Sequence, residues 1–178
     1  MSSSFNVQSS TIGTDFSNQS ATALFALGTH ALGSQNTEWV YVQAQTTISS
    51  ISWVAFNATY SAGMASGGDA NAGLPFGISN TVISASSYGW IAIRGNGMTG
   101  RFTGTGSLAQ SSGQLQLASS AGPTGIMMVG TVGTASNTVA GVYLVATSSA
   151  SASASAGLGI DGSNVALFNL VWPNVMSA

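Results

Sequence analysis

Residues 38–44 read EWVYVQA, and this stretch sets the fold expected for the chain. It is rich in β-branched and aromatic side chains and shows no helical spacing of its apolar positions. Such runs are typical of β-strands. A second run of the same character, YGWIAIR, occupies residues 88–94. Together they predict a β-rich fold.

Short apolar clusters recur along the rest of the chain, separated by Gly, Ser, Asn and Asp. Residues 114–117 (QLQL) alternate strictly, which places two leucines on one face of a strand and two glutamines on the other. Eight or nine short strands at this spacing predict an all-β fold, an antiparallel β-sandwich or β-barrel, and both architectures remain open. The predicted strands cover residues 38–44, 48–57, 77–85, 88–94, 101–105, 114–118, 126–129, 141–146 and 164–171.

The N-terminal segment differs in composition from the rest of the chain. Residues 1–22 are rich in Ser, Thr, Asn and Gln with isolated aromatic residues, among them Phe5 and Phe16. They predict an extended N-terminal arm whose aromatic side chains need a surface to lie on, with a frayed terminus as the alternative. Residues 23–178 are expected to form a single β-rich domain, in which the Ser/Ala-rich run at 148–156 is a loop.

Charge is the most unusual feature of the composition. Charged residues make up 3 % of the chain, against about 25 % in a typical soluble domain. There is no lysine, and Arg94 and Arg101 are the only arginines, so nucleic-acid binding is not expected. No run of about 20 apolar residues suggests a membrane span, although the mean hydropathy is +0.35. Without cysteine there is no disulfide, thiol nucleophile or zinc-thiolate site.

The glycine-rich segment GNGMTG at residues 95–100 matches the G-x-G-x-x-G pattern of dinucleotide-binding proteins. That pattern needs a helix after the glycines and an acidic residue about 20 positions later. Here a strand pattern follows, and the next acidic residue is Asp161. The segment instead predicts a hairpin turn at Asn96 and Gly97, because both residue types tolerate positive φ.

Few residues of the chain are candidates for catalysis. His30 is the only histidine, and a triad built from it with Asp15 or Asp69 and one of many serines is not selected by any spacing. The four carboxylates are scattered, so neither a glycosidase pair nor a metal-ligand set stands out. We therefore assign no catalytic, cofactor-binding or metal-binding residue and expect a protein that is not an enzyme and uses no cofactor.

Aromatic residues are better candidates for protein contacts. Trp39, Trp53 and Trp90 lie inside apolar strand patterns, which favours a core or subunit interface over a sugar-stacking platform. Trp172 precedes Pro173 near the end of the chain, where it could anchor a tail. The candidate protein–protein contact residues are Phe5, Phe16 and Trp172.

Two segments resemble a known group of proteins. Residues 28–44, GTHALGSQNTEWVYVQA, resemble the "LGT…GsdGteyvYvqA" opening of small proteins encoded beside the major capsid protein in tailed bacteriophages. Residues 77–78, followed by YGWIAIRG at 88–95, resemble their "GvA…ygWvqirG" strand. The similarity covers residues 25 to 145, and these proteins look like head decoration, or capsid cement, proteins.

This resemblance implies a β-rich protein without catalytic activity that binds the outer capsid surface, often as a trimer. The expected partners are the major capsid protein and other copies of the chain, and the expected location is the virion exterior after assembly in the host cytoplasm. Low charge agrees with this, because neutral polar groups cost less to desolvate at an interface than ions. The alternatives are a receptor- or glycan-binding module of a tail spike or fibre and, third, a secreted hydrolase that depends on His30.

Overall fold

The computed structural model describes residues 7–8, 15–66, 69, 73–103, 114–117, 125–130, 138–145 and 165–176. Strands account for nearly all regular structure in this part of the chain, so the predicted all-β character is confirmed. The short 3-10 helix η1 (Ser34–Asn36) joins two of the strands. Phe5 and the predicted 148–156 loop lie outside the described residues.

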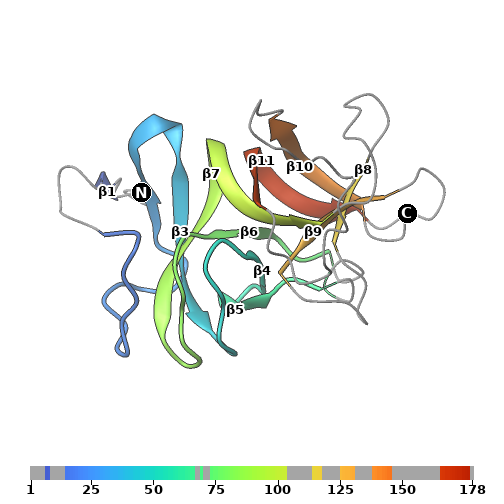
Figure 1. Ribbon diagram of the computed structural model, residues 1–178. Helices are drawn as coiled ribbons and strands as arrows, with labels where there is room; N and C mark the ends of the chain where they lie inside the picture. The colour runs from blue at the N-terminus through green and yellow to red at the C-terminus, as the bar shows by residue number, and fades with distance from the viewer. Residues whose placement is uncertain are drawn as a thin grey trace.

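Eleven strands within the described ranges form one sheet (Figure 1). They are β1 (Val7–Gln8), β2 (His30–Leu32), β3 (Glu38–Ala44), β4 (Trp53–Phe56), β5 (Ser61–Met64), β6 (Phe76–Ser79), β7 (Tyr88–Thr103), β8 (Gln114–Leu117), β9 (Met127–Gly130), β10 (Thr138–Val145) and β11 (Val165–Met176).

The sheet is mixed, which corrects the expectation of a purely antiparallel one. Three pairings are parallel, β1–β2, β3–β5 and β7–β9, and each joins two residue pairs. The β3–β5 case has a simple cause. Strand β4 folds back on β5 as an antiparallel hairpin, so that β5, and not β4, comes to lie beside β3.

Strand pairing closes into two circuits that share β7. The first circuit runs through β3, β5, β4, β6 and β7, and the second through β7, β11, β10, β8 and β9. The first half of β7 pairs with β3 and β6, and its second half pairs with β11 and β9. Figure 1 shows β7 extending across the molecule between the two groups of strands. This long strand therefore connects the two halves of the fold.

The predicted hairpin turn at Asn96 and Gly97 is wrong, because β7 continues through these residues. Gly95 pairs with Leu170 and Met98 pairs with Phe168. Three residue steps on β7 thus lie opposite two on β11, so β7 carries an extra residue. Gly95 and Gly97 have φ values of 154° and 66°, and the amide of Gly97 donates to Asn169 Oδ1 at 3.0 Å. The glycines thus form a β-bulge, which bends a strand instead of reversing it.

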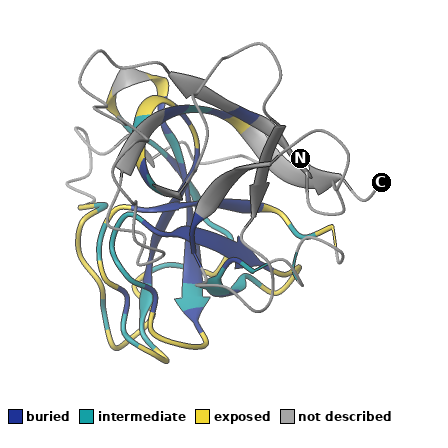
Figure 2. Cartoon of the chain, turned by 45° about the vertical axis from the view of Figure 1, so that its right-hand side comes forward, coloured by how far each residue is buried: buried dark blue, intermediate teal, exposed yellow. Residues whose placement is uncertain are grey.

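Strand β3 of the first circuit is buried on both faces. In β3, Trp39 and Tyr41 belong to one core cluster, while Val40 and Val42 belong to the other. This explains why EWVYVQA is apolar throughout instead of alternating with polar residues. In Figure 2 the buried residues follow the central strands and exposed residues lie mainly in loops.

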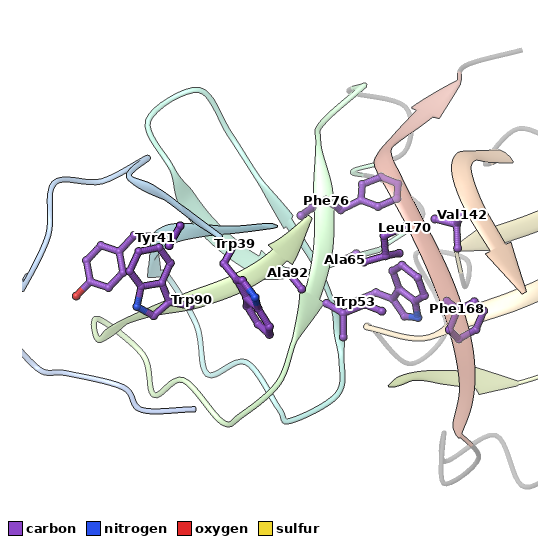
Figure 3. Close-up of a cluster of buried hydrophobic side chains, with 13 residues drawn as sticks. Trp39, Tyr41, Trp53, Ala65, Phe76, Trp90, Ala92, Val142, Phe168 and Leu170 are labelled. Atoms are coloured by element: carbon purple, nitrogen blue, oxygen red, sulfur yellow. The ribbon is translucent and has the colours of Figure 1, made fainter. Parts of the chain in front are cut away.

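The first of these clusters, which we call the aromatic cluster, joins the two circuits. It extends from Tyr41 and Trp90 at one end to Val142 and Phe168 at the other (Figure 3). At the junction, the rings of Trp53 and Phe168 meet edge to face with centroids 5.1 Å apart. The second cluster takes its residues from β3, β4, β5, β7 and nearby loops, and contains Val40, Val42, Ala44, Ile48, Val54, Phe56, Ala62, Ile83, Ile91 and Ile93.

Candidate functional site

Residues 15–27, which we call the strap, lie across the aromatic face of the β3–β7 pair. Ser20 exchanges two backbone hydrogen bonds with Tyr88, at 2.9 and 2.8 Å. The side-chain oxygen of Gln19 accepts from the amide of Ser84 at 2.5 Å. These bonds attach the strap to the start of β7 and to the loop before it.

Aromatic side chains of the strap pack on those of the sheet. Phe16 stacks on Trp39 with centroids 4.8 Å apart and meets Trp90 edge-on at 5.5 Å. Phe25 contacts Tyr41 and Trp90, each at 5.3 Å. Aromatic pairs of this kind each contribute about 0.5–1.5 kcal/mol beyond the area they bury. The strap is therefore a covering layer of the aromatic cluster.

The structure places only one predicted contact residue in full. Phe16 packs on its own chain, as described above, and Phe5 lies outside the described residues. Trp172 belongs to β11, and its side chain lies outside the description. The exposed large apolar side chains of the described residues are different ones, which the sequence did not single out: Leu24, Leu27, Val82 and Val171.

A hollow of about 200 Å³ opens beside the strap. Four aromatic residues form its apolar wall, and polar residues of the strap lie around it. Its lining consists of Asp15, Asn18, Gln19, Ser20, Leu24, Phe25, Tyr41, Tyr88 and Trp90. Because these residues come from three separate stretches of the chain, no local spacing in the sequence revealed the hollow.

Asp15 supplies the negative charge at this hollow. Its carboxylate accepts hydrogen bonds from the hydroxyl and amide of Ser17, at 2.5 and 2.8 Å, and from the side-chain amide of Asn18 at 2.6 Å. These bonds, the Ser17 hydroxyl foremost, lower the pKa of Asp15 from its ordinary value of 3.8. Hydrogen bonds to the charged form stabilise it, so Asp15 is ionised at neutral pH.

His30 does not form the triad considered from the sequence with either aspartate. Its Nδ1 lies 2.8 Å from a carboxylate oxygen of Glu38 on the neighbouring strand. Asp15 bonds within its own turn, and Asp69 accepts from the amide and hydroxyl of Ser66. Within the described ranges, no three His, Asp or Glu side chains gather closely enough to hold a metal ion.

Comparison with known proteins gives no relative: no family model, curated protein or solved structure matches the chain. In the part of the chain that the structure describes, no helix is both long and apolar enough to cross a membrane.

Proposed function

We propose that the chain is a non-catalytic structural protein of a bacteriophage virion. It binds the outer surface of the capsid and stabilises the head by bridging neighbouring major capsid protein subunits, as a homotrimer. The observation that carries this proposal is the pairing of β3 with β7, which aligns Trp39 with Ala92 and Tyr41 with Trp90. The two segments that resemble decoration proteins are thus neighbours at the centre of the fold, although more than forty residues separate them in sequence.

Closure of the sheet supports the barrel form of the expected fold. We infer that each circuit is a small β-barrel and that the two barrels share β7. A closed circuit leaves few free strand edges, which limits uncontrolled association between subunits. Contact with partners then depends on side chains at the surface more than on open backbone edges.

The exposed apolar side chains are candidates for such contacts. Leu27 on the strap is 37 % exposed, and Val171 on β11 is 54 % exposed. Burial of aliphatic side chains is the main favourable term in most protein association. With so few charged groups, little ionic desolvation opposes it.

Purified virions provide the test. Quantitative mass spectrometry of isolated heads is expected to find the protein in stoichiometric proportion to the major capsid protein, and heads that lack it should break at lower temperature. Leu27→Asp should reduce head occupancy, whereas Ala58→Asp, at an exposed turn position, should not. Absence from heads would refute the proposal, and recovery with isolated tails would favour the spike or fibre alternative.

A further inference from the structure

Trp90 differs from its two neighbours in the aromatic cluster in how its indole nitrogen is satisfied. Trp39 Nε1 donates to the hydroxyl of Thr37 at 3.1 Å, and Trp53 Nε1 donates to the carbonyl of Arg101 at 2.9 Å. Trp90 Nε1 has no hydrogen-bond partner among the described residues, although the side chain is only 2 % exposed. This N–H is therefore available to an additional acceptor.

A hollow beside the strap gives such an acceptor a place next to Trp90. Among the described side chains, Ser61 Oγ is the fully enclosed polar atom without a partner, and Trp90 Nε1 is not one of this kind. Trp90 lines the hollow, which connects the indole to the outside. An occupant of the hollow is thus able to accept a hydrogen bond from Trp90.

Other groups around the hollow have unused donors as well. The hydroxyl of Tyr41 accepts from the amide of Leu24 at 3.2 Å but donates to no described group. The side chain of Gln19 uses its oxygen on Ser84, and its amide nitrogen donates to no described group. Polar donors beside the rings of Phe25 and Tyr88 give the hollow an amphipathic character.

These properties select the class of ligand. A purely apolar side chain would leave the donors unpaired, and such mismatches are strongly penalised at binding sites. An anion would meet the ionised Asp15 without a compensating cation, since neither Arg94 nor Arg101 lines the hollow. A volume of about 200 Å³ lies below the range of about 300–1,000 Å³ usual for drug-sized ligands, so the occupant is small.

We propose that this hollow binds one neutral pyranose residue, the terminal sugar of a glycan. The apolar face of the sugar ring packs on Tyr88 and Phe25, and its hydroxyl oxygens accept from Trp90 and Tyr41. The proposal does not depend on capsid binding, since it concerns only the strap and the β3–β7 pair of the isolated chain.

Saturation-transfer NMR on the full chain tests the proposal directly. The probes are the neutral methyl glycosides of glucose, galactose, mannose and N-acetylglucosamine, with glucuronic acid and sialic acid as anionic comparisons. At least one neutral glycoside is expected to receive saturation and to bind with a millimolar dissociation constant, and the two acids are expected not to bind. No transfer to any neutral glycoside, or equal binding of the acids, would overturn the proposal.

Two indole variants separate recognition from packing. Trp90→Phe keeps an aromatic ring but removes the N–H, and should weaken the bound glycoside about threefold to tenfold. Trp39→Phe makes the same change in the same cluster but outside the hollow, and should leave affinity unchanged. Equal effects of the two variants would contradict a specific role for Trp90.

A rim variant keeps the test valid if Trp90→Phe fails to fold. Gln19 is exposed, and Gln19→Glu keeps the oxygen that accepts from Ser84 while it removes the amide donor, so this variant should fold normally and should bind the glycoside more weakly. Unchanged affinity in this variant, with Trp90→Phe unfolded, would count against the site. Head occupancy is measured separately, so failure of sugar binding and failure of the capsid proposal give different results.

Discussion

Gly77 provides a sharp test of how the first circuit is packed. It lies in β6 between Phe76 and Ile78 and is buried. A Cβ at this position would overlap the carbonyl oxygen of Ala92 and lie 2.8 Å from Cγ2 of Ile91. Ordinary contacts of a Cβ begin at about 3.4 Å, so Gly77→Ala forces β6 and β7 apart.

The expected cost follows from which atoms must move. The obstructing oxygen belongs to the backbone of β7, which is fixed by pairing of Ile78 with Ala92 and of Ser79 with Ile91. Overpacking of a well-packed core costs typically about 1–3 kcal/mol, and a backbone obstacle favours the upper end. Alanine also restricts the unfolded chain more than glycine does, which raises the free energy of unfolding by about 0.4–1 kcal/mol. The net loss in free energy of unfolding is therefore about 2 kcal/mol or more.

Urea unfolding followed by tryptophan fluorescence measures this loss. Gly63→Ala is the matched control, because Gly63 lies in β5 of the same circuit and its Cβ would meet only Thr46 Oγ1 at 3.8 Å. The free energy of unfolding of the control should lie within about 0.5 kcal/mol of that of the parent protein, or slightly above it. If Gly77→Ala also stays within that margin, the close approach of β6 to β7 is refuted.

Three further perturbations test the strap and the junction between the circuits. Phe16→Ala removes two ring contacts and should destabilise the strap by about 1–3 kcal/mol, seen as faster hydrogen exchange of the Ser20 amide; unchanged exchange would contradict the packing. Because the pKa of Asp15 is lowered in the folded state, its contribution to stability is present at neutral pH and is lost as pH falls through that lowered pKa. Asp15→Asn should abolish this part of the acid sensitivity, monitored by NMR of the strap amides, and retention of the same profile would exclude Asp15 as its source. Phe168→Ala should cost about 3–5 kcal/mol in urea unfolding, and a double-mutant cycle with Trp53→Ala should give a coupling of about 0.5–1.5 kcal/mol, whereas simple additivity would argue against their contact.

The sequence predicted strands well where large apolar side chains cluster or alternate with polar ones. The predicted strand at 38–44 coincides with β3, and the leucine–glutamine run at 114–117 coincides with β8. Strand β5 was missed because its sequence, SAGM, has three small residues, a single large one and no alternation. Its position depends on pairing with β4 and β3, which local sequence does not encode.

The glycine segment shows a different limit of sequence reasoning. Asn96 and Gly97 have the composition of a hairpin turn, and the backbone at Gly97 does take a positive φ of 66°. The positive φ was therefore predicted correctly for Gly97 but not for Asn96, and the two residues do not form a turn. Whether such a residue reverses a strand or bends it depends on β11, which lies about seventy residues later and pairs with β7 across the bulge.

The candidate contact residue Phe16 shows a related limit of sequence reasoning. The requirement of Phe16 for a surface was visible in the sequence, but the sequence does not distinguish a surface on the same chain from one on a partner. Burial of β3 and β7 on both faces decides the matter for this residue, since Trp39 and Trp90 need a cover and the strap provides it.

The low charge of the chain, together with this arrangement, indicates what kind of surface remains for contact with a partner. Phe16, one of the aromatic residues that suggested an intermolecular contact, packs on its own chain, so in the described part of the chain a partner would meet what the strap and sheet leave exposed. That remainder combines isolated aliphatic side chains such as Leu27 and Val171 with neutral amides and hydroxyls. Such a surface favours extended contact with other neutral polar surfaces, protein or sugar, because neither side has to give up the hydration of an ion.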